Sequence, residues 1–220
     1  MFDYRELRAL FDITEPLGWS EKTISSLKAE YGSLPSALED YYRQCAGYDL
    51  LASNSAGDYL MPAEKVGMYK EQGYYVFFCE NQSVSFWGIK LEDMGKPDPP
   101  VYENYDRGEW FLTGDSLSKF LISEGYLCAV ASGLEYATED YLEADEEQAE
   151  NIRSKFEHIE RAESGIYQGA EFYRINENSY MALLPDSCGS LVIFASKSEK
   201  GFDAAEKVVL PLFDIDPEED

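Results

Sequence analysis

The hydrophobic period of this chain changes near residue 74, and that change limits the fold more than any other feature. Before it, apolar residues recur every three or four positions in three short segments, which predicts helices around 7–11, 20–32 and 35–47. After it, the runs YYVFFCE and SVSFWGIK are rich in aromatic and β-branched residues and flank a short polar break, as in an antiparallel hairpin. Helices followed by antiparallel strands are typical of an α+β fold.

Further strands and a helix follow the hairpin. PVYENY and EWFL are predicted to be two short strands joined by a turn at 106–108. A helix capped by Asp115 extends to about Gly133, and the runs IYQGAEFYRI, NSYMALLP and CGSLVIFAS form a C-terminal β-meander within about 165–213. The charged tail DIDPEED has little to bury and is expected to lack regular structure. Length and 45% apolar content suit one domain over residues 1–220.

The segment of about 134–164 is strongly acidic. Between Gly133 and Arg153 the sequence contains a run of carboxylates and no base. We interpret this run as an additional helical segment with a hydrated acidic face, since like charges at this density keep a surface solvated. The alternative is a patch that faces a partner, and the sequence leaves both interpretations open.

The overall charge limits the partners. The chain has 18 basic and 43 acidic residues, so its net charge is −25 at pH 7. Nucleic acid and anionic membranes would repel such a protein, whereas a basic protein would attract it. No apolar stretch approaches the ~18 residues of a membrane span, and the opening MFDYRELRALFD does not resemble a secretory signal. The wide spacing of Cys45, Cys79, Cys128 and Cys188 predicts buried reduced thiols in a cytoplasmic protein.

No pattern in the sequence predicts catalysis. His158 is the single histidine, and we place it on the exposed side of a helix whose apolar stripe includes Phe156. Neither a glycine-rich phosphate loop nor a spaced set of metal ligands is present, so we expect no cofactor and no metal. Two carboxylates facing each other in a deep pocket would still suit a hydrolase, because their separation depends on the fold. A carboxylate-dependent hydrolase is therefore a minor alternative.

Four short motifs occur in an order that resembles the SUKH superfamily, the bacterial immunity proteins related to a fungal cell-wall synthesis regulator. SLPSALEDYYRQCAGYDL is similar to the family's leucine-proline entry into a helix that ends near a glycine, and FFCENQSVSFWGIK to its glutamate, short turn and tryptophan-glycine strand. DPPVYEN resembles the family's strand entry, and Trp110 precedes a Ser/Leu/Phe-Leu helix at 117–121. The family-like core covers about 20–133. Two features depart from the pattern: AGY at 46–48 replaces an asparagine with paired glycines, and the acidic segment has no counterpart.

The resemblance implies an α+β domain in which N-terminal helices pack against a mainly antiparallel sheet. It also implies an immunity protein that binds and neutralises a bacterial toxin domain without covalent chemistry. A basic toxin, such as a nuclease, would match the charge of this chain. We therefore expect a surface with an aromatic centre and an acidic rim, formed by Glu80, Tyr102, Tyr105, Asp106, Trp110, Glu135, Asp140, Glu143, Asp145 and Glu146.

Alternatives remain for the function and for the aromatic residues. The chain could be a cytoplasmic regulatory or scaffold module, as the resemblance to the fungal relatives implies, and a toxin gene beside this one would favour immunity. Glu80 and Gln82 are predicted to serve the turn of the hairpin, while Tyr102, Tyr105 and Trp110 either join the core or stay on an open sheet face as anchors for a partner. The oligomeric state is not predicted. The predicted core residues of the hairpin are Phe77, Phe78, Phe86, Trp87 and Ile89.

Overall fold

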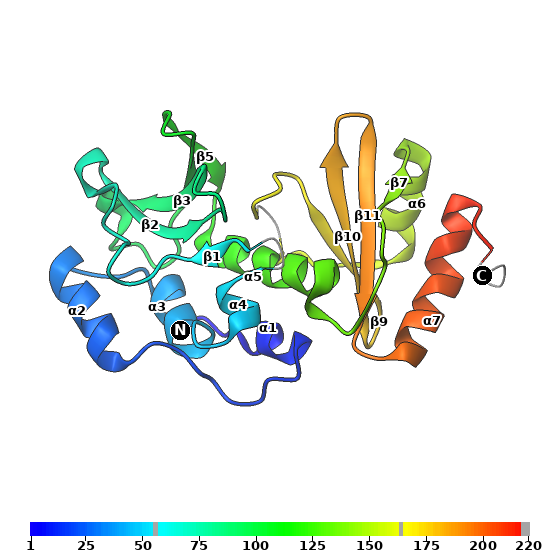
Figure 1. The fold of residues 1–220 in the computed structure, drawn as a ribbon, viewed down its shortest axis with the longest axis horizontal. Coiled ribbons are helices and arrows are strands. Elements are labelled where there is room, and N and C mark those ends of the chain that lie inside the picture. The colour runs from blue at the N-terminus through cyan, green and yellow to red at the C-terminus, as the bar shows by residue number, and fades with distance from the viewer. Residues whose placement is uncertain (55–56, 163–164, 217–220) are drawn as a thin grey trace.

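The computed structural model describes residues 1–54, 57–162 and 165–216. Two antiparallel sheets stand on either side of a central helix, α5 (Leu117–Cys128), and further helices pack against each sheet (Figure 1). This mixture of helices and antiparallel strands confirms the predicted α+β class. The last four residues of the tail, for which no regular structure is predicted, lie outside the described residues.

Four short helices open the chain, and the first three confirm the three predicted helices, whereas the fourth is not predicted. Helix α2 begins where the Ser20 side chain accepts a hydrogen bond from the Thr23 N–H, at 3.2 Å, and it ends at Gly32, whose φ is 80°. Glycine suits that conformation because it has no Cβ. The bounds of the four helices are Arg5–Leu10 (α1), Glu21–Tyr31 (α2), Ser36–Gln44 (α3) and Asp49–Ala52 (α4).

The first sheet contains five strands in the order β1-β2-β3-β4-β5. Strands β2 to β5 confirm the two predicted hairpins, while β1 is too short to give a pattern in the sequence. Two 3-10 turns, η1 and η2, flank the β2–β3 hairpin. The bounds are Tyr59–Leu60 (β1), Lys70–Gln72 (η1), Tyr74–Cys79 (β2), Ser85–Lys90 (β3), Leu91–Asp93 (η2), Val101–Tyr105 (β4) and Trp110–Gly114 (β5).

Both faces of this sheet are covered, which an alternating pattern does not predict. Five consecutive residues of β2 and five of β3 are buried. On one face, Phe77 and Trp87 pack against Phe120 of α5, with ring centroids 5.4 and 6.1 Å apart. On the other face, Phe86 packs against Tyr69 at 5.3 Å. All the predicted core residues of the hairpin are therefore buried, but from two sides.

Helix α5 lies between the two sheets and is buried on almost every side. Eleven of its twelve residues are buried. Its N-cap is Ser116, one residue after the predicted Asp115. Gly125 allows helix α1 to come close, because a Cβ at that position would lie 2.6 Å from Cδ2 of Leu7. The helix continues as a wider turn, η3 (Ala129–Gly133), which ends where the sequence predicts.

The second sheet contains the predicted C-terminal meander at its centre. Its strand order is β6-β11-β10-β9-β8, and β7 pairs with β11 beside β6. Helices α6 and α7 cover the face that is turned away from α5 (Figure 1). The bounds are Tyr136–Ala137 (β6), Leu142–Ala144 (β7), Glu146–Lys155 (α6), Glu157–His158 (β8), Glu171–Asn176 (β9), Ser179–Asp186 (β10), Gly189–Ser196 (β11), Glu199–Val209 (α7) and Leu210–Phe213 (η4).

Two predictions for the segment 134–164 are wrong. The helix covers only the span of α6, and the residues before it form β6 and β7, which pair with β11. Leu142 and Ala144 pack toward the core while the residue between them is exposed, which is the period of a strand. His158 lies in β8 rather than in a helix. Its ring is half-buried, 5.3 Å from the ring of Tyr173, because β8 pairs with β9.

Helix α7 replaces the strand region predicted up to about residue 213. The Ser198 side chain caps it by accepting a hydrogen bond from the Gly201 N–H at 3.2 Å. Phe202, Ala205 and Val209 recur at helical spacing and pack on the second sheet. That spacing, together with the serine cap, is the pattern that would have predicted this helix.

One hydrophobic core extends through both sheets. Tyr126 of α5 lies 6.0 and 5.6 Å from the rings of Phe172 and Tyr180 in the second sheet, and residues of the four N-terminal helices join the same core. A smaller core fills the space between the other face of that sheet and helices α6 and α7. Helix α5 therefore carries the contacts that hold the first sheet to the second.

The four cysteines all lie within the described residues, and they form no disulfide. Cys45, Cys79 and Cys128 are buried, as predicted. Cys188 is exposed, so the prediction is wrong for this residue. It lies in the tight turn between β10 and β11, where the chain leaves the core.

Candidate functional site

The structure divides the ten predicted partner-binding residues into two groups. Glu80 and the residues from Tyr102 to Trp110 lie on the first sheet, in the β2–β3 turn and the β4–β5 hairpin. The residues from Glu135 to Glu146 lie on the second sheet, along β6, β7 and the start of α6. Figure 1 shows β5 and the β7–α6 region on opposite sides of α5. The acidic rim and the aromatic centre therefore do not share one surface.

Glu80 is used by the turn of its own hairpin, in the role that the sequence predicts for it. Its Oε2 accepts hydrogen bonds from the Gln82 N–H at 3.0 Å and from the Val84 N–H at 3.1 Å. These bonds hold the β2–β3 turn closed. One carboxylate oxygen of Glu80 is therefore already hydrogen-bonded within the turn and is not free to bind a partner.

Asp106 also serves a turn. Asp106 and Arg107 have φ values of 48° and 58°, and the Gly108 N–H donates to the Tyr105 carbonyl at 2.9 Å. This is the primed turn that matches the twist of a hairpin. The side-chain amide of the buried Asn104 donates to the Gly108 carbonyl at 2.6 Å and fixes the turn on the sheet. The turn predicted at 106–108 is confirmed.

Trp110 and Tyr102 belong to a packed aromatic group on the outer face of the first sheet. The indole of Trp110 is stacked on Tyr74, with centroids 4.1 Å apart, and its Nε1–H donates to Oε1 of Gln72 at 3.0 Å. Tyr102 meets the same Tyr74 ring edge-on at 5.7 Å, and the Lys90 ammonium lies 4.7 Å from its centroid. Both predicted anchors are half-buried. They form a rigid base rather than a free aromatic surface.

The exposed apolar surface lies beside this group, on strand β5. Phe111 is 45% exposed and Leu112 is 50% exposed, and Tyr105 at the end of β4 is 60% exposed. We call Tyr105, Trp110, Phe111 and Leu112 the β5 edge. Among the described residues, β5 is the last strand of its sheet, and its sequence WFLTG contains neither a charge nor a proline to discourage pairing. An apolar strand edge that is open in this way is a typical place for another chain to bind.

Carboxylates lie in strand β4 beside β5, in the β4–β5 turn and just after the end of β5. Between residues 103 and 115 the chain has four acids and one base, Arg107. Glu103 lies opposite Phe111 in the sheet and accepts a hydrogen bond from the Ser85 hydroxyl at 2.9 Å. Burial raises the pKa of Glu103, and the hydrogen bond from Ser85 offsets part of that increase. The four acids are Glu103, Asp106, Glu109 and Asp115.

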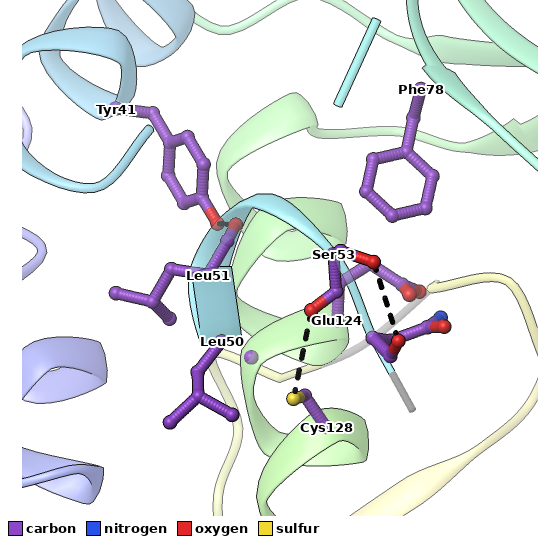
Figure 2. Close-up of a pocket in the computed structure, with 9 residues that line it drawn as sticks. Tyr41, Leu50, Leu51, Ser53, Phe78, Glu124 and Cys128 are labelled. Carbon is purple, nitrogen blue, oxygen red and sulfur yellow. Dashed lines mark hydrogen bonds between the residues drawn. The ribbon is translucent and has the colours of Figure 1, made fainter. Parts of the chain in front are cut away.

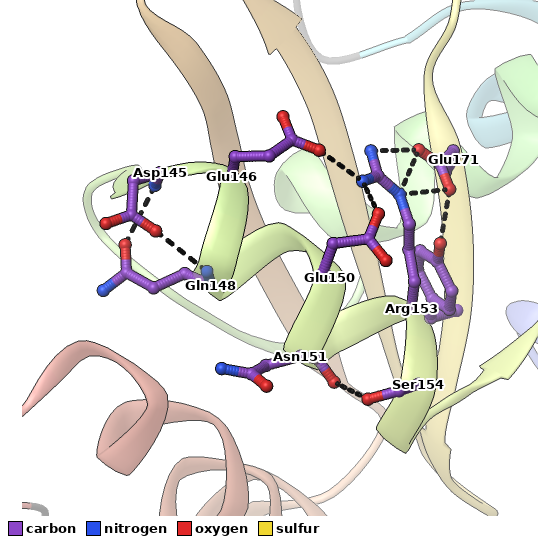
Figure 3. Close-up of polar contacts among 9 residues, drawn as sticks. Asp145, Glu146, Gln148, Glu150, Asn151, Arg153, Ser154 and Glu171 are labelled. Atoms are coloured by element: carbon purple, nitrogen blue, oxygen red, sulfur yellow. Dashed lines mark hydrogen bonds and ion pairs between the residues drawn. The ribbon is translucent and has the colours of Figure 1, made fainter.

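The second group of predicted residues is partly structural (Figure 3). Asp145 and Gln148 form a capping box at the start of α6, with two hydrogen bonds of 2.9 Å. Glu146 lies 3.3 Å from Arg153, which also pairs with Glu150 at 2.8 Å and with Glu171 at 3.0 Å. The positive charge of Arg153 therefore offsets part of the negative charge of Glu146 and Glu150. The other predicted residues of this group, Glu135, Asp140 and Glu143, are exposed.

Glu171 shows how this network balances burial against ion pairing. Burial alone would raise the pKa of its carboxyl, but hydrogen bonds from Arg153 and from the Tyr173 hydroxyl outweigh burial and lower that pKa. Glu171 therefore stays ionised beside Arg153. Both partners are partly open to solvent, and solvent-screened ion pairs stabilise a fold by about 1 kcal/mol at most.

The sequence gives no indication of a buried acid, yet α5 contains one. Glu124 lines a cavity of about 10 Å³ with residues of α3, α4 and β2 (Figure 2). Its Oε1 accepts a hydrogen bond from the Ile166 N–H at 2.8 Å, while its Oε2 makes none among the described residues. Burial raises the pKa of Glu124 to about 8, against a smaller opposing effect of Ile166 and the nearby Asn54. This carboxyl is largely protonated at neutral pH.

Asp58 lies near Glu124, which raises the question of a hydrolase. Its Oδ1 accepts the Asn81 N–H at 3.0 Å, and its Oδ2 accepts the Asn54 side-chain amide at 2.9 Å. A space of about 10 Å³ beside Glu124 holds one water molecule at most. The adjoining pocket, which Asn54 and Asp58 line, has a volume of about 90 Å³. Asp58 thus has a partner at each carboxylate oxygen and Glu124 at one, and the space beside them is small for a substrate.

Comparison with known proteins gives no support for a family assignment. No protein family, no curated protein and no solved structure matches this chain. Among the helices of the described residues, none has the length and apolar character needed to cross a membrane. The contacts, exposure and charge of this chain, with the motifs that resemble the SUKH superfamily, are therefore what indicates its function.

Proposed function

We propose that this protein is an immunity protein that binds a basic toxin domain in the bacterial cytoplasm and neutralises it without chemistry of its own. The observation that carries the proposal is the open β5 edge, where Phe111 and Leu112 remain about half-exposed beside four carboxylates. Rigid aromatic and aliphatic side chains within a charged rim are the usual composition of a binding surface. The resemblance of four motifs to the SUKH superfamily is what suggests a toxin as the class of partner.

The net charge supports a basic partner. At −25, the chain attracts a basic protein over a distance of about a Debye length, which is ~8 Å at physiological ionic strength. A nuclease would present such a charge, because its cleft must hold phosphate. Steering of this kind speeds association, whereas the apolar contacts at β5 would slow dissociation.

Co-expression with the toxin encoded by the adjacent gene tests the proposal. We expect a stable complex and protection of the cells. Phe111→Ala is expected to weaken the complex about tenfold or more, since truncation of a central apolar anchor costs more than ~1 kcal/mol of binding free energy. Tyr141→Ala, which removes an exposed ring outside the first sheet, is the matched control and should bind as the wild type does.

The outcomes separate the candidate functions. The absence of both a complex and protection would contradict the proposal. A complex without protection would instead favour the regulatory or scaffold module, which would use the same surface for another purpose. Turnover of a substrate by the purified protein would favour the hydrolase.

A further inference from the structure

The direction of the backbone groups on β5 follows from the hydrogen bonds of its neighbours. The N–H of Asp106 donates to the C=O of Val84 at 2.8 Å, so the backbone N–H of residue 106 points to the β3 side of β4. Successive residues of a strand direct their backbone N–H and C=O groups to opposite sides. The backbone groups of Asn104 therefore also point toward β3, and those of Glu103 point toward β5. Glu103 is paired with Phe111. The backbone groups of Phe111 thus bond back to β4.

Trp110 and Leu112 have the opposite orientation. They flank Phe111, so their N–H and C=O groups point away from β4, toward the side on which no strand of the described residues lies. The hydrogen bonds of β3 agree with this assignment. The C=O of Ser85 accepts the Glu80 N–H at 2.9 Å and so faces β2, whereas the C=O of the preceding Val84 faces β4. The open edge of β5 therefore presents two successive sets of backbone donors and acceptors.

The side chains of β5 show which kind of object could cover the edge. Phe111 and Leu112 are neighbours in a strand, so they point to opposite faces of the sheet. Both are nevertheless about half-exposed. A helix or a flat surface laid on one face would cover only one of them. An extended segment paired with β5 would place its own side chains over both.

The charges at the two ends of β5 define the partner further. Glu109 precedes the strand and Asp115 follows it, and both are exposed. Six residues of extended chain span about 20 Å, so a segment paired with β5 would meet a carboxylate near each end. A second copy of this chain would bring acid against acid there. A segment with lysine or arginine about six positions apart would be complementary.

We propose that the partner adds one extended segment to β5, with apolar side chains over Phe111 and Leu112 and basic side chains near Glu109 and Asp115. This inference rests on the proposed function, and it specifies how the toxin is held. Main-chain hydrogen bonds to Trp110 and Leu112 contribute affinity, and the two carboxylates select a basic segment.

Two variants at one position test the strand addition against the same toxin. Leu112→Ala removes the side chain and keeps the outward N–H, whereas Leu112→Pro removes the N–H as well. Proline is tolerated on an edge strand when its missing N–H would face solvent, so we expect the two variants to have similar unfolding midpoints. The dissociation constant of Leu112→Pro should exceed that of Leu112→Ala about tenfold, since a buried acceptor on the partner loses its donor.

A peptide provides a readout that does not depend on the toxin. We would add a peptide of about seven residues, with lysine at both ends and alternating valine and threonine between them, and follow the backbone amide resonances of the whole chain. The amides of Trp110 and Leu112 are expected to shift. A peptide with glutamate at both ends is the control and should leave them unchanged.

The results distinguish the failure of this inference from the failure of the proposed function. Equal affinities of the two Leu112 variants for the toxin would overturn strand addition, even where both bind less well than the wild type. Shifts at Trp110 and Leu112 with the lysine peptide would support it, even if the adjacent gene's product does not bind. If this chain forms a dimer and Leu112→Pro dissociates it, the segment paired with β5 belongs to a second copy of the chain. That result would overturn the proposal.

Discussion

Replacement of Phe120 by alanine is expected to lower the free energy of unfolding by about 3–5 kcal/mol. The ring of Phe120 is fully buried near the start of α5 and packs against Phe77, Phe78 and Trp87 of the first sheet. Alanine would leave a cavity that these large rings cannot fill without leaving their own positions. Because α5 also holds the second sheet, we expect the whole fold to lose this stability rather than one sheet alone.

Urea unfolding followed by tryptophan fluorescence would measure this loss, since Trp87 lies beside the altered position. Phe111→Ala is the matched control, because it removes the same side chain from a half-exposed site and should lower stability by only about 1 kcal/mol. Similar losses in the two variants would contradict the burial that the structure assigns to Phe120.

The second large effect is a dependence of stability on pH that is due to Glu124. Its pKa is raised from the usual value of 4.5 to about 8 in the folded state, mainly by burial. The folded state therefore binds a proton that the unfolded state has lost between about pH 4.5 and pH 8. Across that interval this group makes stability fall as pH rises, and above about pH 8 the fall ends. The loss from this one carboxyl amounts to roughly 5 kcal/mol as an upper bound.

Glu124→Gln removes the titrating group and keeps its shape. We expect the variant to be as stable as the wild type near pH 4.5 and more stable by several kcal/mol near pH 9. Chemical unfolding at a series of pH values would measure the difference between the two proteins. Glu147→Gln, at an exposed position of α6, is the control and should follow the wild type. A constant difference between Glu124→Gln and the wild type at every pH would contradict the raised pKa.

Much of the fold follows from local patterns in the sequence. The spacing of apolar residues in α2 and α3, the aromatic runs of β2 and β3, and the meander β9-β10-β11 are each determined by neighbours along the chain. The wrong predictions concern segments whose secondary structure depends on residues far away in the sequence. Strands β6 and β7 exist because β11 offers an edge, and an acidic segment gives no local indication of that pairing.

The candidate site was harder to predict than the fold, because exposure depends on which strand is last in a sheet. The run EWFL predicts a strand correctly, but the same letters would suit a buried central strand. Phe111 and Leu112 are exposed only because the chain turns into α5 after β5. Glu124 was equally hidden, since its burial depends on the approach of the chain around Ile166, far away in sequence.

Amide hydrogen exchange of the complex with the adjacent gene's toxin tests the central claim most directly. In the free protein, the outward N–H groups of Trp110 and Leu112 should exchange quickly, while the N–H of Phe111 is protected by its bond to β4. Binding is expected to slow exchange at Trp110 and Leu112 by at least about tenfold. Protection that appears instead along β7 and α6, with β5 unchanged, would contradict the assignment of the binding surface to the first sheet.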